Sequence, residues 1–293
     1  MESLLSLAFD NLSSYDGPKV RKGLRQVEGL LAQICLSNPN AADRANRGRD
    51  PDRNDNEASL SESKDLGELS QDPAFREFFK LQEGFEWNVA MRLIGTLDRL
   101  MAKGSDGQND LLILSALDLI QGTLLLHPPS KSLFSREQNM NLLLDLLEPF
   151  NCPAIQSATL LTLVTALIDT PRNTRTFEDL DGLLTVTSLF KSRSTAREVK
   201  LKLVEFLYFY LMPEMPSIPR ADQRDSVPGM LQRSPSKLAG AFSSETRSKS
   251  GPAEGDFTLT TAEKQELLSQ HLSSVEDLVK DLRNCAPFGG VVC

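Results

Sequence analysis

Hydrophobic residues recur along the middle of the chain at a spacing of 43 residues, as between Phe134 and Phe177. The same spacing pairs Leu160 with Leu203, Leu163 with Phe206 and, one unit earlier, Leu117 with Leu160. Armadillo and HEAT helical repeats have periods in the forties. Each unit of such a protein leaves an apolar face that only its neighbour covers, so the units stack into a slab. The pattern predicts three units between about residues 86 and 212.

Shorter spacings predict the individual helices. Apolar residues three and four apart form stripes over about 20–34, 86–102 and 110–126. Asp72 followed by Pro73 indicates a further helix start. Three pairs have the capping-box spacing, namely Ser135 with Gln138, Thr195 with Glu198, and Thr260 with Glu263. Because no stretch has the period-two alternation of a β-strand, the expected fold is all-α, an armadillo/HEAT-like helical repeat slab.

Two stretches lack this periodicity. Asn, Asp, Arg, Ser and Glu dominate residues 38–71, which cannot bury enough apolar surface to offset chain entropy and are expected to be a disordered insertion. Residues 213–257 are rich in Pro, Ser, Gly and Arg, as in a flexible linker. The expected organisation is therefore N-terminal helices of the repeat domain in 1–37, the insertion in 38–71, armadillo-like repeats in 72–212, the linker in 213–257 and a C-terminal amphipathic heptad helix in 258–285.

Two predicted helices carry candidate partner-binding residues. The helix over about 196–212 is apolar around most of its circumference and includes the aromatic residues Phe206, Tyr208, Phe209 and Tyr210. Two interpretations explain this pattern equally well. The helix is either a central helix of the core, or the last helix of the slab, whose outer side must be covered by a partner or by the chain's own tail helix. The tail has a heptad seam of Leu268, Leu272, Val275, Val279 and Leu282. A seam this short suits half of a coiled coil, a helix that docks back on the slab, or a partner-binding helix.

The chain offers little catalytic chemistry. His127 and His271 are the only histidines, and neither lies in a metal-binding motif, which favours structural or solvated roles. No glycine-rich nucleotide loop or nucleophile elbow is present. We therefore expect no enzyme activity, no catalytic residue, no metal and no cofactor.

Net charge and hydropathy limit the classes of partner. The formal net charge of −8 argues against nucleic acid as a partner. No apolar run approaches the roughly 20 residues of a membrane span, so membrane insertion is not expected and the protein should be cytosolic or nuclear. One basic cluster is either a solvated face or a contact for an acidic partner; it consists of Arg172, Arg175, Lys191, Arg193, Arg197, Lys200 and Lys202.

Ser234, followed by Pro235, is a candidate phosphorylation site for a proline-directed kinase.

Several segments resemble one known family. They are Val20–Leu31, Asp72–Phe75, Phe85–Val89 and the stretch from His127 to Leu147. In these segments the chain resembles the cell division control protein 14 family of the fungal septation initiation network. The resemblance covers about residues 1–37 and 72–212, and more weakly the tail helix.

This resemblance implies a non-catalytic subunit that binds a germinal-centre-type, Ste20-like protein kinase. It also implies a cytoplasmic protein recruited to the spindle pole body, with a role in septum formation. An unrelated phosphatase of the same name uses a Cys-x5-Arg loop, but the sixth residue after Cys35 is Ala41 and the sixth after Cys152 is Ala158. The alternative interpretation is a self-associating structural scaffold of helical-repeat type, although a homo-oligomer is not the expected state.

Overall fold

The computed structural model describes residues 1–36, 63–102, 107–214 and 258–276. These ranges hold helices and one isolated bridge between Leu36 and Ser63, without a β-strand. The helices are α1 (Glu2–Leu12), α2 (Gly17–Cys35), α4 (Leu66–Gln71), α5 (Pro73–Gln82), α6 (Val89–Ala102), α7 (Asp110–Leu126), the 3-10 helix η1 (Pro128–Ser135), α8 (Glu137–Asp145), α9 (Pro153–Leu167), α10 (Pro171–Asp179), α11 (Gly182–Lys191), α12 (Arg197–Leu211) and α13 (Thr261–Ser269). The all-α fold class is confirmed.

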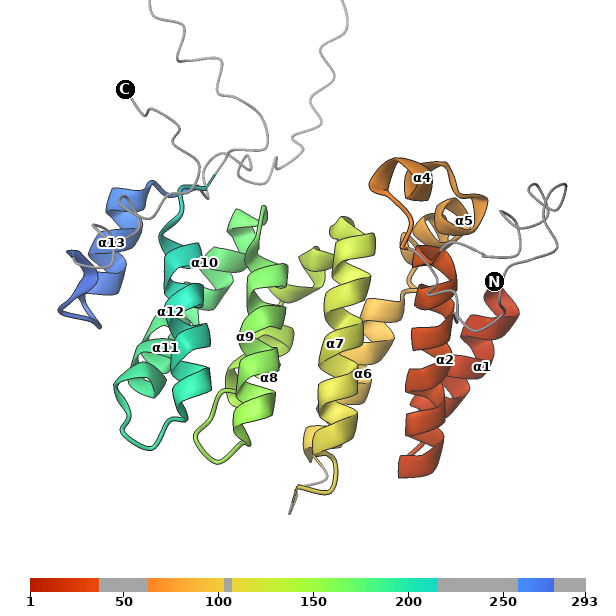
Figure 1. The fold of residues 1–293 in the computed structure, drawn as a ribbon, viewed down its shortest axis with the longest axis horizontal. Coiled ribbons are helices and arrows are strands. Elements are labelled where there is room, and N and C mark those ends of the chain that lie inside the picture. The colour runs from red at the N-terminus through yellow and green to blue at the C-terminus, as the bar shows by residue number, and fades with distance from the viewer. Residues whose placement is uncertain (37–62, 103–106, 215–257, 277–293) are drawn as a thin grey trace, which may run out of the picture.

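A short helix, a second helix and a longer third helix follow one another three times. The units are α5–α6–α7, η1–α8–α9 and α10–α11–α12. The third helices α7, α9 and α12 lie side by side with α2 in one layer, and α6, α8 and α11 lie behind them (Figure 1). Equivalent positions are buried in successive units, as for Phe134 of η1 and Phe177 of α10. The 43-residue spacing therefore corresponds to stacked three-helix units.

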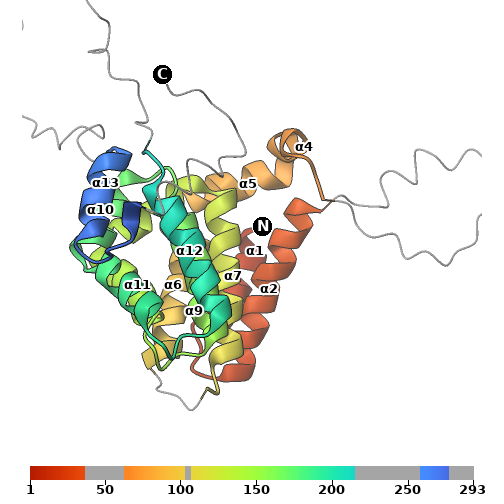
Figure 2. The ribbon, with the colours of Figure 1, turned by 60° about the vertical axis from the view of Figure 1, so that its left-hand side comes forward.

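The two ends of the slab are covered by different helices. At the N-terminal end α1 and α2 form an antiparallel pair, and α2 packs on α7. Leu5, Leu12 and Val27 of this pair are buried in the common core. At the other end α13 packs on α12 and lies close to α10 (Figure 2). The terminal units of a stacked repeat need such covers because one of their apolar faces has no neighbour.

Two of the predicted capping boxes are absent. The hydroxyl of Ser135 donates to the carbonyl oxygen of Ser132 at 2.8 Å, and that of Thr195 donates to the carbonyl oxygen of Leu189 at 2.7 Å. Neither caps the following helix, since the N-cap positions of α8 and α12 fall one residue later. Both hydroxyls instead bond backward to the end of the preceding helix, which is the usual competitor of capping for Ser and Thr.

The third capping box and the Asp72 cap are confirmed. The Glu263 amide lies 3.4 Å from Thr260 Oγ1, and the Thr260 amide donates to Glu263 Oε2 at 2.7 Å. The Asp72 carboxylate accepts from the amides of Ala74 and Phe75 at 2.7 and 3.4 Å. These side chains satisfy amides that have no partner within the first helical turn.

The end of the expected insertion is ordered. Residues 63–71 contain α4, whereas the sequence pattern predicted disorder as far as residue 71. Lys64 pairs with Asp72 and donates to the carbonyl oxygen of Ile34 at 2.8 Å. This polar anchorage holds a segment whose own hydrophobic content is low. Residues 38–62 of the expected insertion lie outside the described residues.

The tail differs from one continuous heptad helix over 258–285. Helix α13 ends at Ser269, and turns follow as far as residue 274. Leu268, Leu272 and Val275 are nevertheless all buried, because the chain after the helix stays against the slab. Residues 277–293, with Val279 and Leu282, lie outside the described residues. Among the helices that are described, none is long and apolar enough to cross a membrane.

Candidate protein-binding surfaces

The aromatic residues of α12 belong mainly to the core. Phe206 and Tyr210 are each 1% exposed, whereas Tyr208 and Phe209 are half-buried. The Phe206 ring lies 5.6 Å from the Phe177 ring and 6.2 Å from the Phe209 ring, centre to centre, at tilted angles. Phe206 and Tyr210 therefore could not touch a partner while the chain keeps this arrangement.

Helix α13 covers the end of α12. The ammonium of Lys264 lies 5.1 Å from the centre of the Tyr210 ring, and the seam residues Leu268, Leu272 and Val275 are buried. Of the arrangements that the heptad pattern left open, the structure has the one in which the tail docks back on its own slab. Ser234 lies outside the described residues.

A buried ionic network, here called the C-terminal clasp, joins α10, the end of α12 and α13. The clasp consists of Arg175, Glu178, Tyr210, Glu214 and Lys264. Arg175 Nη2 lies 2.9 Å from Glu178 Oε1 and 2.9 Å from Glu214 Oε1. Lys264 Nζ lies 2.9 Å from Glu214 Oε1, and the Tyr210 hydroxyl donates to Glu178 Oε1 at 2.6 Å. Glu214 therefore bridges the slab and the tail helix.

Burial shifts the ionisation of the clasp. It raises the pKa of Glu178, against the hydrogen bond from Tyr210 and the charge of Arg175. It raises the pKa of the Tyr210 phenol as well, with the neighbouring Glu178 carboxylate adding to the shift. It lowers the pKa of Lys264, against the hydrogen bond to Glu214. These groups lose their water and interact mainly with one another, so the cost of burial offsets much of their mutual attraction.

Sequence reasoning placed Arg175 in a basic cluster and did not find the clasp. The structure divides that cluster, because Arg175 is in the clasp, Lys191 donates to the carbonyl oxygen of His271, and Lys202 pairs with Glu205 at 2.6 Å. A signal for the clasp was present, since Lys264 stands four residues before Leu268 on the seam side of the tail helix. A lysine on an apolar face needs a buried acidic partner.

A second surface lies on the outer side of the layer of third helices. We call it the leucine face, and it consists of Leu111 and Leu125 of α7, Leu161 of α9 and Leu201 of α12. Their exposed fractions are 71%, 65%, 43% and 58%. Helical spacing explains their position, because each lies opposite the side of its helix that packs into the core. Large apolar side chains are thus exposed on three consecutive third helices.

A groove of about 540 Å³ extends the leucine face between α2 and α7. Arg21, Arg25 and Glu28 of α2 line it from one side, and Leu111 and Asp118 of α7 from the other. Burial raises the pKa of Asp118, and the charge of Glu28 adds to the shift. The groove combines an apolar floor with charges of both signs, a composition suited to another protein surface.

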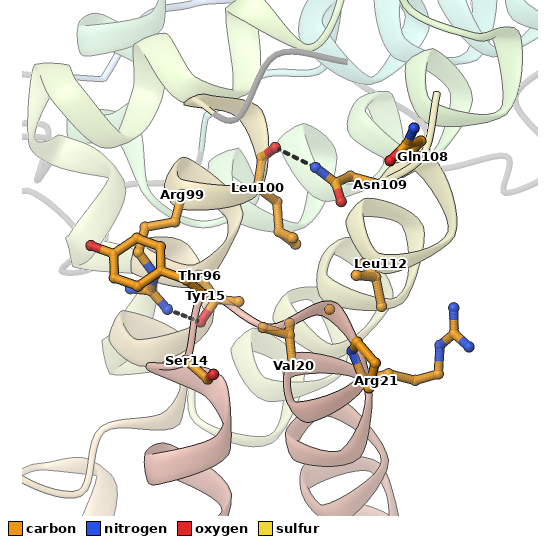
Figure 3. A pocket seen from close by; sticks show the side chains of 12 residues that line it. Ser14, Tyr15, Val20, Arg21, Thr96, Arg99, Leu100, Gln108, Asn109 and Leu112 are labelled. Carbon is orange, nitrogen blue, oxygen red and sulfur yellow. Dashed lines mark hydrogen bonds between the residues drawn. The ribbon is translucent and has the colours of Figure 1, made fainter. Parts of the chain in front are cut away.

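A cavity of about 380 Å³ lies where the α1–α2 turn meets α6 and the start of α7. Arg99 Nη2 donates to Thr96 Oγ1 at 3.3 Å and Asn109 Nδ2 to the Leu100 carbonyl oxygen at 3.1 Å (Figure 3). The residues that line it include no His, Cys, Asp or Glu. The described part of the chain also has no cluster of three His, Cys, Asp or Glu residues that could hold a metal ion.

Comparison with known proteins decides the family. A family model described as "Cell division control protein 14, SIN component" matches residues 1–288. The chain belongs to the cell division control protein 14 family. Cell division control protein 14 of Schizosaccharomyces pombe is 27% identical to it over 297 residues, which cover 99% of this chain and 97% of that protein. No solved structure matches.

Membership of the cell division control protein 14 family confirms the resemblance found in the sequence. The family is the one of SIN (septation initiation network) components, and it is distinct from the phosphatase that shares its name. The matched region includes α1 to α13, so the clasp and the leucine face both lie within it.

Proposed function

We propose that this chain is a non-catalytic adaptor subunit that binds a Ste20-like, germinal-centre protein kinase in septation initiation signalling. In this role it supports the placement of the kinase at the spindle pole body and thereby septum formation. Family membership supplies the pathway. The observation that carries the binding role is the leucine face, which exposes large apolar side chains on three consecutive helices.

We infer further that the three-helix units are of the armadillo type. Their order of one short helix followed by two longer ones, and their period of 43 residues, support this assignment. Stacked repeats of this kind present one helix per unit along an extended surface, which usually binds another protein. The leucine face lies on that layer of helices.

The distribution of apolar residues favours a binding surface over chance exposure. Single exposed leucines are normal on any protein, whereas grouped apolar residues mark interaction sites, and the leucine face has four exposed leucines on the outward sides of three neighbouring helices. The α2–α7 groove continues the face and adds charged residues at its rim. An apolar centre with a polar rim is the usual anatomy of a protein interface.

The proposal is tested by mixing the purified chain with the candidate kinase and following complex formation by light scattering and kinase assay. The variant Leu161→Glu with Leu201→Glu should lose most of the binding, because it places two charges at the centre of the interface. The loss should be at least tenfold, since hot-spot residues contribute about 2 kcal/mol or more. Circular dichroism should show unchanged helix content, because both side chains are exposed.

Leu184 of α11 provides the matched control. It is 47% exposed, but it lies in the other layer of helices. Leu184→Glu should leave kinase binding unchanged. Equal effects of the two changes would remove the leucine face as the binding site, and failure of the wild-type chain to bind the kinase at micromolar concentration would overturn the proposed function itself.

A further inference from the structure

Lys264 is a buried cation of helix α13 that contacts the slab. Lys264 Nζ pairs with Glu214 and donates to the carbonyl oxygen of Met212 at 3.1 Å. Its ammonium also lies over the Tyr210 ring. The Lys264 side chain is 4% exposed, so its charge is held by these groups almost without water.

Three charged side chains share the clasp with Lys264, and two of them are acidic. Glu178 and Glu214 are two carboxylates, and Arg175 is the positive group between them. Nε and Nη1 of Arg175 are buried without a hydrogen-bond partner among the described residues. The position of Lys264 therefore favours a cation, and the clasp as it stands keeps two buried Arg175 donors unsatisfied.

The same face has apolar features that suit a helix. It buries Leu268, Leu272 and Val275 of the tail. A cavity of about 210 Å³ beside Lys264 is lined in part by Phe209. A helix with a larger apolar side chain would find room there.

A long stretch of chain connects α12 to α13. Glu214 and Leu259 stand at the two ends of residues 215–257, yet the Leu259 amide donates to Glu214 Oε2 at 2.9 Å. Residues 215–257 are long enough to span on the order of 100 Å if fully extended, so chain length alone does not keep α13 against α12. Helix α13 has nine residues, and a helix so short is marginal in water without a surface to pack on.

We propose that this face is a docking site for an amphipathic helix of a partner protein, and that α13 occupies it as a built-in competitor. The partner helix carries a lysine or arginine in the place of Lys264 and apolar residues in the places of Leu268, Leu272 and Val275. A tethered helix competes at an effective concentration of millimolar order, so a partner displaces α13 only when it fits better or is held elsewhere as well. The proposal goes beyond the kinase-binding role and does not depend on it.

A fluorescently labelled peptide of residues 258–276 is the probe, titrated by anisotropy against two full-length chains. One is the wild type, and the other carries Leu268→Asp with Leu272→Asp, which prevents α13 from burying its apolar side. The peptide should bind the variant at least tenfold more tightly than the wild type, because the competing helix has been removed. A peptide with Lys264→Glu should bind the variant at least tenfold more weakly, whereas one with Ala262→Glu, at an exposed position, should bind within about twofold.

Circular dichroism checks that the variant chain loses no more helix than α13 contains. If it loses more, Lys264→Gln, which leaves the leucines in place, serves as the released chain in the same titration. Equal binding of the probe to wild-type and released chains would overturn the proposal, and so would equal binding of the Lys264→Glu peptide. A wild-type dimer that the leucine changes dissociate would also overturn it, because the occupant would then be a second copy of the chain.

Discussion

His127 is buried in surroundings that suit only the neutral imidazole. Its Nδ1 lies 2.8 Å from Ser130 Oγ, and its ring meets the Phe79 ring edge-on at 4.5 Å. Nε2 is buried and has no hydrogen-bond partner among the described residues. Burial lowers the pKa of His127, against the charge of Glu83. The histidine acts as a packing and hydrogen-bonding residue where α7 ends and η1 begins.

Stability should therefore fall on acidification through His127. Between the lowered pKa of the folded state and the ordinary value near 6.5, the unfolded chain binds more protons, so the free energy of unfolding rises with pH. The contribution is complete above about pH 6.5 and is lost as the pH falls through the folded pKa. Its slope is at most about 1.4 kcal/mol per pH unit for one proton.

Urea unfolding at several pH values checks this, with His127→Asn as the comparison. Asparagine can place an amide near the position of Nδ1 and does not titrate. The difference in unfolding free energy between wild type and variant should shrink as the pH falls from 7.5 to 5.5. A difference that stays constant would show that His127 is not responsible.

At the scale of one helix, the start of α11 depends on a glycine. Asp181 precedes it with a φ of 57°, in the left-handed region, and Gly182 then packs directly against Phe177. A Cβ atom on Gly182 would lie 2.4 Å from the Phe177 ring and 2.5 Å from its carbonyl oxygen. Real Cβ contacts are not this short, so the close approach of α10 and α11 requires glycine.

Two glycine-to-alanine changes should therefore have opposite effects. Gly182→Ala should lower the free energy of unfolding by about 1–3 kcal/mol, because a packed ring and a backbone carbonyl must shift. Gly29→Ala, in the middle of α2 with nothing within 4 Å of its added Cβ, should raise it by about 0.4–1 kcal/mol. Chemical denaturation measures both. Changes in the same direction would contradict the packing seen at Gly182.

At the scale of the whole molecule, Asn173 joins the last two units of the slab. Its Nδ2 donates to the Lys131 carbonyl oxygen at 2.8 Å and to the Ala166 carbonyl oxygen at 2.7 Å. The Lys131 ammonium in turn donates to the carbonyl oxygen of Ile168 at 3.1 Å. These buried bonds tie α10 to η1 and α9. Because a stacked repeat contacts only its neighbours, loss of such a bond is felt locally.

Asn173→Ala should loosen the C-terminal end of the slab. Each buried carbonyl left without its donor costs about 1–3 kcal/mol, so amide hydrogen exchange should accelerate in α10, α11 and α12. Helices α1 and α2 should keep their protection. Asn141→Ala, on the exposed side of α8, is the matched control and should change little. Equal acceleration at both ends would show that the slab unfolds as one cooperative body.

The sequence predicted the architecture because its signals are local or periodic. Apolar residues three and four apart located the stripes now seen in α2, α6 and α7, and the 43-residue spacing located the units. The Asp72 cap and the capping box at Thr260 were confirmed. Ser135 and Thr195 were misassigned because a hydroxyl near a helix start can bond backward as well as forward, and sequence spacing does not distinguish the two.

The sequence by itself therefore determined the all-helical fold, the repeating unit and the family, because each depends on which residues occur at which spacing along the chain. Tertiary structure alone decided which apolar faces stay exposed. The aromatic residues of α12 are covered by α10 and by the chain's own tail, whereas leucines of α7, α9 and α12 remain exposed. It also decided that Arg175, Glu178, Glu214 and Lys264 form one clasp. Arg175 and Glu178 are neighbours on α10, but Glu214 and Lys264 are far from them in sequence. Only the stacking of the units and the return of the tail bring these charges together, where loss of water makes each depend on the others.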